Sequence, residues 1–578
     1  MAVAPPGPTF SIQDIPFSYR GSWINISPVV AENTYADDLH LVSHQTGLHP
    51  VLRFTPSADT SVTCTPALLT WRHGTGRVQL TYESPDTIRL RGDGLGMRIA
   101  AAPATLTPFS GIYLYRDPVD GSHVFTSYET GRRYRLTMLH GDLDGAAGVQ
   151  SLGTAERSVT LPAGRSWEIA IEEYDTARRS YAATATFDEV CRAGGAAFTA
   201  FVDAVAPWRS PDTPAAELAA YVLWSATVAP AGFLARPAVL MSKHWMDKVW
   251  SWDHCFNALA LAVGQPELAW HQFQLPFDHQ DQTGALPDSV THSEVLYNYV
   301  KPPIHGWALH HLRRHLTTPP DRAELTNTYD RLARWTEFWL TARRVPDHDL
   351  PHYQHGNDSG WDNATTFDHH RVVETADLAA FLVVQLRQLA DLAAELDQPQ
   401  AVADWNHTAE QIFTAMLDQL WTGDRFAARS AETGQAQAST SLLDLMPITL
   451  GADLPADVAA ALARRIETHL TAYGLATEPV DSADYVADGY WRGPIWAPST
   501  ILIEDGLRRA GHTGLADEIS HRFRTLCEKS GFAENFDAET GAGLRDRAYT
   551  WTASSYLILA AAQERRRSPA SAGEPNVR

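Results

Sequence analysis

The strongest constraint on the fold is a helical pattern that continues from Ala215 to about Gln563. Apolar residues recur there at the three- and four-residue spacing of amphipathic helices, and polar, Gly or Pro clusters separate the segments. The pattern predicts helices near residues 215–228, 253–263, 266–281, 304–316, 322–343, 372–396, 399–420, 438–449, 455–472, 495–510, 514–529 and 548–563.

The connections between these segments are of two kinds. Those after even-numbered segments are short turns, as at Gly264–Glu267 and Ala510–Gly514. Those after odd-numbered segments are mostly longer and rich in Trp, Tyr, Asp, Asn, Gly and His. If neighbouring helices are antiparallel, six helical hairpins closing into a ring form an (α/α)6 toroid barrel with every long connection at one end. Because functional residues concentrate on loops held by a rigid scaffold, we expect the site at that end.

The residues before the helical region alternate between apolar and polar side chains instead. Arg77–Ser84 and Arg165–Tyr174 are examples, and turn signals separate such runs, which is typical of an antiparallel β-sandwich. We therefore predict a multidomain chain with a β-sandwich domain over 1–185, a helical linker over 186–213, the all-α (α/α)6 catalytic barrel over 214–566 and a disordered tail over 567–578.

Composition narrows the class of protein. The 46 basic and 68 acidic residues give a net charge of −22, which disfavours nucleic acid and anionic membrane surfaces as partners. No apolar stretch approaches the roughly 18 residues of a membrane helix, and the first ten residues lack the features of a signal peptide. The four cysteines lie far apart in sequence, so we expect a cytoplasmic protein without disulfides. The oligomeric state is left open.

The long connections combine aromatic rings with carboxylates and amides. This combination favours a carbohydrate substrate, because sugars stack their C–H faces on Trp and Tyr and offer hydroxyls to polar groups. Glycosidic cleavage also needs two carboxyl groups on opposite sides of the bond. Two of the loops supply the candidates, which are Asp358, Asp362 and Asp368 in one and Glu534, Asp537 and Glu539 in the other.

Five motifs occur in a fixed order along these loops: WSWDH from Trp250, YNYVKPPIHGW from Tyr297, HGNDSGWDNATTF from His355, GYWRGPIW from Gly489 and FAENFDAETG from Phe532. Together they are similar to glycoside hydrolase family 63, which includes processing α-glucosidase I, bacterial α-glucosidases and the mannosylglycerate and glucosylglycerate hydrolases. The resemblance spans about residues 215–565 and implies an (α/α)6 barrel that hydrolyses α-glycosides with inversion. The preceding β-sandwich is also similar to those found before many such barrels.

The resemblance implies a role for particular residues. Asp362 is the expected general acid and Glu534 the expected general base. The motifs also supply the expected substrate-binding residues, which are Trp252, Asp253, His254, Lys301, Trp361, Asn363, Tyr490, Trp491, Arg492 and Trp496. Lys301 departs from the family, which often has Gln before the Pro-Pro pair. This cation leaves the acceptor open and makes an anionic acceptor such as glycerate one candidate.

Each of these residues also has a purely structural interpretation. Asp362 and Asp253 stand where an Asp could cap a helix, and Glu534 could be a solvated loop residue, with Glu539 as its main competitor for the role of base. The tryptophans could fill the barrel, and Arg492 could pair with a loop carboxylate. The ordered set of motifs favours the functional interpretation for the two carboxyl groups.

We expect neither a cofactor nor a metal. His352, His355, His369 and His370 lie close together in sequence but lack the spacing of a zinc site, and the acidic run beside them lacks the EF-hand pattern, which leaves a structural calcium ion undecided. The sequence therefore predicts an inverting, exo-acting hydrolase of terminal α-glucosyl residues. Trehalase, debranching glucosidase and glucosylglycerate or mannosylglycerate hydrolase are the alternatives, followed by a toroid phosphorylase or a non-catalytic carbohydrate-binding protein.

Overall fold

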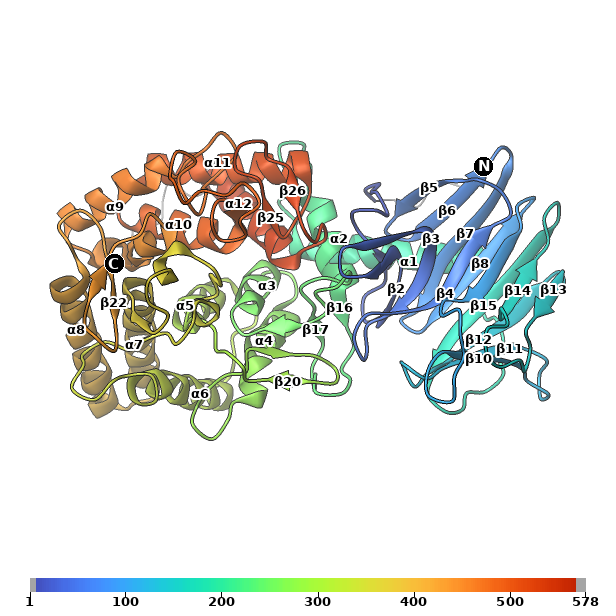
Figure 1. Cartoon of the computed structure of the whole chain (residues 1–578), viewed down its shortest axis with the longest axis horizontal. Helices are drawn as coiled ribbons and strands as arrows, with labels where there is room; N and C mark the ends of the chain where they lie inside the picture. The colour runs from blue at the N-terminus through green and yellow to red at the C-terminus, as the bar shows by residue number, and fades with distance from the viewer. Residues whose placement is uncertain (1–6, 568–578) are drawn as a thin grey trace. The chain divides into compact units, whose positions relative to one another are not determined.

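The computed structural model describes residues 7–567, which divide into two compact units. The β-rich unit takes in the chain up to residue 207 together with 220–248 and 291–293. The helical unit takes in 208–219, 249–290 and the chain from 294 onward. Figure 1 shows the strands of the first unit in blue and cyan and the helices of the second in green to red.

Two antiparallel sheets form the β-rich unit and confirm the predicted sandwich. The first has the order β1 (Phe17–Ser18), β2 (Ile24–Ala31), β3 (Thr34–Ser43), β4 (His49–Pro56), β9 (Met97–Ala101), β14 (Ser158–Leu161) and β13 (Gly145–Ala147). The second has the order β10 (Ile112–Arg116), β11 (His123–Ser127), β12 (Arg133–His140), β15 (Ser166–Tyr174), β8 (Thr87–Asp93), β7 (Gly76–Ser84), β6 (Leu68–His73) and β5 (Ser61–Thr65). Alternate residues of both sheets, such as Ile99 and Leu90, point into one core, as period-2 patterning requires.

A helix covers part of this sandwich. Helix α1 (Phe187–Val205) contacts β7 and begins with a capping box in which Thr186 and Glu189 bond reciprocally to each other's backbone N–H. The chain continues through α2 (Ala216–Ala226) and the short paired strands β16 (Thr227–Val228) and β17 (Ala238–Val239).

The helical unit contains the remaining predicted helices. They are α3 (Asp253–Leu261), α4 (Pro266–Gln274), η1 (Pro276–His279), α5 (His305–His315), α6 (Arg322–Thr341), α7 (Ala376–Glu395), α8 (Pro399–Leu420), η4 (Leu442–Asp453), α9 (Ala456–Thr468), α10 (Ala497–Arg509), α11 (Thr513–Ser530) and α12 (Thr550–Arg567). The segment predicted as a helix over 438–449 is the 3-10 helix η4, because Pro447 lies inside it and Gly451, with φ of 62°, interrupts the helical backbone.

Six of these elements form a closed inner ring. Each contacts the next in the order α3, α5, α7, η4, α10 and α12, and α12 contacts α3 again. Outer helices lie against the inner ones, with α4 on α3, α8 on α7, α9 on η4 and α11 on α10 (Figure 1). The alternation of short and long connections thus corresponds to an (α/α)6 barrel, and every inner element follows a long connection.

Three small sheets hold the long connections together in pairs. Strand β18 (Val249–Trp250) pairs with β19 (Ser289–Val290), which pairs with β20 (Val295–Leu296). Strand β21 (Val373–Glu374) pairs with β22 (Ala428–Ser430), followed by β23 (Ala436–Gln437). Strand β24 (Ile495–Trp496) pairs with β25 (Asn535–Phe536), followed by β26 (Gly543–Leu544). Strand pairing therefore fixes the positions of loops that are distant in sequence relative to one another, close to the N-termini of the inner helices.

None of the helices among residues 7–567 is both long enough and apolar enough to cross a membrane. Of the tail predicted to be disordered over 567–578, Arg567 is the last residue of α12, and the rest lies outside the described residues.

Candidate active site

Two acidic loops carry the predicted catalytic carboxyl groups, one before α7 and one before α12, and the structure gives their carboxylates different tasks. In the first, Asp358 accepts hydrogen bonds from Arg343 Nη1 at 2.6 Å and from the backbone N–H groups of Val300 and Gln354. It is buried and fully engaged, so it holds the loop in place.

Asp368 and Asp362 of the same loop differ from each other. Asp368 forms an ion pair with Arg492. The Asp362 side chain is partly exposed and, among residues 7–567, makes no hydrogen bond or ion pair with a side chain of another residue. Burial raises the pKa of Asp362, while the nearby Lys301 ammonium lowers it. A largely buried carboxyl that has no side-chain partner and a raised pKa suits a general acid.

Glu534 is the buried carboxyl of the second acidic loop. Its backbone N–H bonds to the Asp546 carbonyl oxygen at 2.7 Å, and it directly precedes β25, whose pairing with β24 fixes its position. Burial and the Asp546 carboxylate raise the pKa of Glu534 to about 8, whereas Arg545 and a hydrogen bond from the Tyr490 hydroxyl lower it. Asp537, by contrast, accepts two backbone N–H bonds in the hairpin turn, and Glu539 is exposed.

Asp253 opens α3 and is also buried. One of its carboxyl oxygens, Oδ2, has no hydrogen-bond partner within the described chain, and burial raises the pKa of the group to about 8. Lys301 lowers this pKa, and Asp288 and Asp362 raise it, so these four charged groups lie close together. A buried carboxyl with an unused acceptor is suited to a sugar hydroxyl.

Lys301 is enclosed by acceptors. Its ammonium lies 3.0 Å from Asp288 Oδ1 and donates to the Asn357 carbonyl oxygen at 3.0 Å. Burial disfavours its charge, but Asp362, Asp288 and Asp253 outweigh that effect and raise the pKa of Lys301. The residue thus balances the charge of the acidic groups around it.

Asn363 connects the first acidic loop to the GYWRGPIW loop. Its Nδ2 donates to the Gly489 carbonyl oxygen at 3.0 Å, and its Oδ1 accepts from the Trp491 N–H at 3.0 Å. Arg492 Nε donates to the Asn363 carbonyl oxygen at 2.8 Å. Asn363 and Arg492, both predicted to bind substrate, therefore use these groups to join two loops, which fixes Asp362 relative to Tyr490.

Tryptophan rings form one continuous cluster behind this junction. Trp491 and Trp496 stack with ring centroids 4.0 Å apart, and Trp361 lies 4.6 Å from Trp491. Trp252 meets the cluster through Trp491 and through Trp551, at 6.4 and 5.7 Å. Since none of the five residues is more than 3% exposed, they chiefly form a rigid wall rather than an open stacking surface.

Tyr490 and Arg545 contact each other and share an uncommon backbone conformation. Their φ angles are 64° and 58°, and the Arg545 guanidinium lies 4.9 Å from the Tyr490 ring centroid. Arg545 also donates to Asn535 Oδ1 at 3.0 Å and pairs with Asp488 at 2.8 Å. Left-handed backbone at bulky residues is often retained at functional sites.

Arg545, Asp288 and Tyr549 were absent from the residues predicted from sequence. Tyr549 is buried, and Glu534 and Asp253 both raise its pKa, so it lies near both carboxyl groups. The pattern Leu544–Tyr549 carries no recognisable motif. A usable signal for Asp288 was its position just before a strand in the loop that also carries Lys301.

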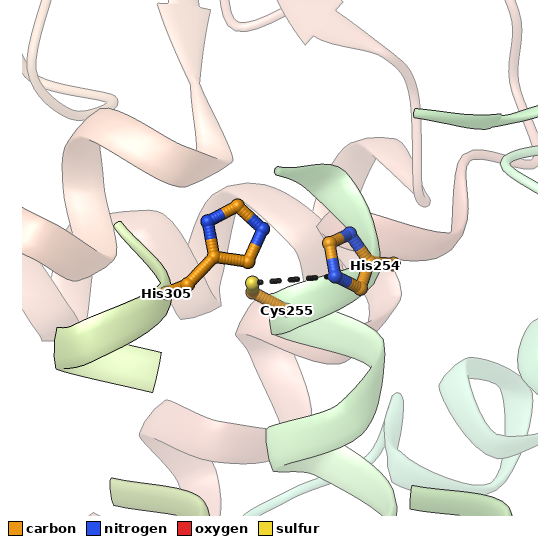
Figure 2. Close-up of side chains that lie close together, drawn as sticks. All are labelled: His254, Cys255 and His305. Carbon is orange, nitrogen blue, oxygen red and sulfur yellow. Dashed lines mark hydrogen bonds between the residues drawn. The ribbon is translucent and has the colours of Figure 1, made fainter. Parts of the chain in front are cut away.

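The predicted substrate ligand His254 lies fully buried with its ring directed at protein groups. Its Nδ1 is 3.0 Å from the Trp250 carbonyl oxygen, and its Nε2 is 3.7 Å from Cys255 Sγ. With His305 these residues form the group of possible metal ligands that comes together in the described chain (Figure 2). His352, His355, His369 and His370, which are close together in sequence, form no such group among the described residues. His355, for example, caps a short 3-10 helix, η2 (Gly356–Ser359), and stacks on Tyr299.

Comparison with solved structures supports this architecture. A glycoside hydrolase family 63 mannosylglycerate hydrolase from Thermus thermophilus, in complex with glucose, is similar over 59% of this chain and 98% of its own, with 21% identity and a TM-score of 0.52. A bacterial glucoamylase complexed with acarbose matches 98% of this chain and 96% of its own, with 12% identity and a TM-score of 0.62. The second likeness includes the β-rich unit.

Relatives with assigned names match the sequence directly. The mannosylglycerate hydrolase of Rubrobacter radiotolerans is 25% identical over 417 residues, 56% of this chain and 92% of the relative. The glucosylglycerate hydrolase of Mycolicibacterium hassiacum is 22% identical over 424 residues, 56% of this chain and 94% of the relative. A family model described as the mannosylglycerate hydrolase MGH1-like glycoside hydrolase domain matches residues 246–552. Since that match covers more than half of the chain and confirms the resemblance to glycoside hydrolase family 63, the protein belongs to this family and is a glycoside hydrolase.

Proposed function

We propose that the protein is an inverting, exo-acting hydrolase that removes a terminal α-glucosyl residue from a small acceptor. In this proposal Asp362 is the general acid, Glu534 is the general base, and Asp253 binds hydroxyls of the terminal sugar. The alternatives are a glycosidase for another α-linked hexose, such as mannose, and the related trehalase and debranching activities.

The observation that carries the proposal is the division of tasks among the acidic residues of the two loops. Asp358 and Asp368 are bound to Arg343 and Arg492, and Asp537 organises a turn. Asp362 and Glu534 instead have raised pKa values. Burial raises the pKa of Tyr490, and both of these carboxyl groups raise it further, which supports their placement around one site.

The proposed reaction uses the two carboxyl groups on opposite sides of the glycosidic bond. Asp362 donates its proton to the leaving oxygen while positive charge develops on the sugar ring. Glu534 takes a proton from a water molecule that attacks the anomeric carbon from the other face. The products are a β-configured sugar and the protonated acceptor. Asp253 holds the ring through its hydroxyls, and the buried tryptophan wall keeps the loops that carry Asp362 and Tyr490 in place.

The pKa values of Asp362 and Glu534 set the pH range in which this mechanism operates. Burial raises the pKa of Asp362, which favours the protonated form that a general acid requires. With a pKa of about 8, Glu534 is largely protonated in the free enzyme at pH 7, so its ionised, active form increases as pH rises toward 8. Arg545 and Tyr490 stabilise that ionised form.

Glycerate is the first acceptor to test, because the named relatives are glucosylglycerate and mannosylglycerate hydrolases. Lys301 is already neutralised by Asp288, which disfavours it as the ligand for an acceptor carboxylate. Arg545 is better suited, because its partner Asp488 has 69% of its side chain exposed and can be replaced by a substrate anion. Arg545, rather than Lys301, therefore binds the acceptor carboxylate in this proposal.

A release assay tests the proposal. Purified protein is incubated with α-glucosylglycerate, α-mannosylglycerate, trehalose, kojibiose and maltose, with and without phosphate, and free sugar and sugar phosphate are measured. We expect phosphate-independent glucose release that Asp362→Asn and Glu534→Gln each reduce at least about a hundredfold. Glu539→Gln, a change of the same type on an exposed turn, is the control and should leave the rate unchanged. Mannose release alone, or sugar phosphate as product, would contradict the glucosidase proposal.

Proton NMR of the first product tests the stereochemistry. An inverting enzyme acting on an α-glucoside yields β-glucose first, and early α-glucose would mean retention. A crystal structure with bound sugar should place the Asp362 and Glu534 carboxyl groups about 6.5–9.5 Å apart, against about 5–5.5 Å in a retaining enzyme.

A further inference from the structure

A buried group of two imidazoles and one thiol lies at the start of two neighbouring inner helices. His254 and Cys255 belong to the first turn of α3, and His305 is the first residue of α5. All three side chains are fully buried, and their possible ligand atoms lie within 4.8 Å of one another. Figure 2 shows the His305 ring facing the Cys255 sulfur from the opposite helix.

His305 is the first reason to regard this group as a binding site. Neither ring nitrogen makes a hydrogen bond of normal geometry in the described structure, although the Ser251 backbone lies near the ring. Phe277, Trp335 and Phe273 surround it, with ring centroids 5.3, 6.1 and 6.3 Å away. An imidazole without a hydrogen bond of normal geometry in an aromatic pocket requires an explanation, and a bound ion or water molecule supplies one.

The geometry of the other two residues is the second reason. A nitrogen about 2.0 Å and a sulfur about 2.3 Å from one metal ion lie roughly 3.5–3.7 Å apart at tetrahedral or trigonal angles. The His254 Nε2 to Cys255 Sγ distance is 3.7 Å, within this range. His254 Nδ1 lies 3.0 Å from the Trp250 carbonyl oxygen, and this bond assigns a proton to Nδ1. The Phe273 backbone is a second partner of the ring, so Nε2, which lies beside Cys255 Sγ, coordinates a metal ion in place of any bond that it makes to Phe273.

We propose that His254, Cys255 and His305 form a buried site for one soft metal ion, with Cu⁺ preferred to Zn²⁺. Thiolate and imidazole are the ligands that both ions accept. Structural zinc sites are almost always four-coordinate, whereas this group supplies three side-chain ligands. One thiolate also neutralises Cu⁺ but leaves a net positive charge with Zn²⁺, which is unfavourable inside an aromatic pocket.

Binding is an exchange of the thiol proton for the metal ion. Cys255 loses its proton to solvent, its sulfur bonds to the ion, and the neutral imidazoles bind through their unprotonated nitrogens. An approach of the His305 ring by about 1 Å completes the set, given the ligand distances involved. The site is independent of the proposed function, although Asp253 immediately precedes it on α3.

Metal titration of the full-length protein tests the proposal without reference to activity. Reduced, chelator-treated protein competes anaerobically with a chromophoric Cu⁺ chelator, and separately with a Zn²⁺ chelator. We expect one Cu⁺ per chain, X-ray absorption that identifies nitrogen and sulfur ligands, and a raised Tm. Cys255→Ala should weaken Cu⁺ binding at least a hundredfold, as should His305→Phe, which retains an aromatic ring in the pocket.

Cys527→Ala is the matched control, since Cys527 is another buried cysteine of the same unit. This variant should bind Cu⁺ like the unchanged protein. Equal Cu⁺ binding by Cys255→Ala, or no stoichiometric binding of either ion by the folded protein, would overturn the site. Stoichiometric Zn²⁺ binding that depends on the three residues, without competitive Cu⁺ binding, would overturn the preference for Cu⁺.

Discussion

The Lys301 ammonium lies 3.0 Å from the Asp288 carboxylate, and both side chains are more than nine-tenths buried. This ion pair stands beside Asp362, and its ammonium lowers the pKa of that carboxyl, in opposition to the effect of burial. The unusual lysine of the sequence is therefore part of the charge balance of the expected general acid.

Replacing Lys301 by Met should raise the pKa of Asp362 further, because the lowering effect of the cation is lost. The acid then stays protonated to higher pH, so the basic limb of the kcat/KM profile should move to higher pH. Leaving Asp288 buried and unpaired should also cost on the order of 3 kcal/mol in free energy of unfolding. Lys301→Arg, which retains the charge, should restore the basic limb; an unchanged limb in Lys301→Met would contradict the assignment of Asp362 as acid.

A substrate with a good leaving group separates the roles of the two carboxyls. A glycosyl fluoride needs little protonation of its leaving group, so Asp362→Asn should retain most of its activity on α-glucosyl fluoride while losing it on alkyl or sugar glycosides. Glu534→Gln should lose activity on both, because water still needs a base. Steady-state kinetics of both variants on α-glucosyl fluoride and on an alkyl glucoside measures these activities. If Glu534→Gln, and not Asp362→Asn, retained activity on the fluoride, the roles of acid and base would be exchanged.

Arg545 should control the acidic limb of the profile. Its guanidinium lowers the pKa of Glu534, so Arg545→Gln should raise that pKa above about 8 and move the acidic limb of kcat/KM to higher pH. If Arg545 also binds the acceptor carboxylate, KM for glucosylglycerate should rise by about tenfold or more, while a neutral glucoside is affected less. Arg545→Lys keeps the charge and should shift the pH limb least.

Buried acids outside the reacting pair should make stability depend on pH. Burial raises the pKa of Glu478 to about 7, above its value in an unfolded chain, and Thr365 donates a hydrogen bond to it. The stability from this group is complete below the unfolded pKa and is lost as pH rises through about 7. The loss is on the order of 3 kcal/mol. Denaturant unfolding at pH 5 and pH 8 should show the decrease, and Glu478→Gln should reduce it. If the unfolding free energies of the unchanged protein and Glu478→Gln differ by the same amount at both pH values, Glu478 does not cause the pH dependence.

Much of the fold was predictable because it depends on local patterning. Helical periodicity located the inner and outer helices, and Pro266 and Pro399 begin α4 and α8 at their first positions. At η4 the predicted helix is a 3-10 helix, because Pro447 and Gly451 interrupt the regular backbone. Apolar periodicity does not specify backbone angles, so it did not predict this difference.

The candidate site could be predicted where a sequence motif carries its residues, and not where tertiary contacts bring them together. Asp362 and Glu534 stand in recognisable motifs, but the sequence did not show that Asn363 uses its amide to bind the Trp491 loop. The roles proposed for Arg545 and His305 depend on neighbours that strand pairing or helix packing brings close, and no local sequence pattern records these neighbours.

The paired strands of the loops also define what can be transplanted between relatives. An exchange of residues 489–496 alone would break the register of β24 with β25, so the hairpin over 535–544 has to accompany it. By the same logic 249–250 belongs with 289–296, and 373–374 with 428–437. We therefore expect substrate preference to transfer between relatives in two-loop modules, whereas a chimaera built from single loops would test scaffold damage rather than specificity.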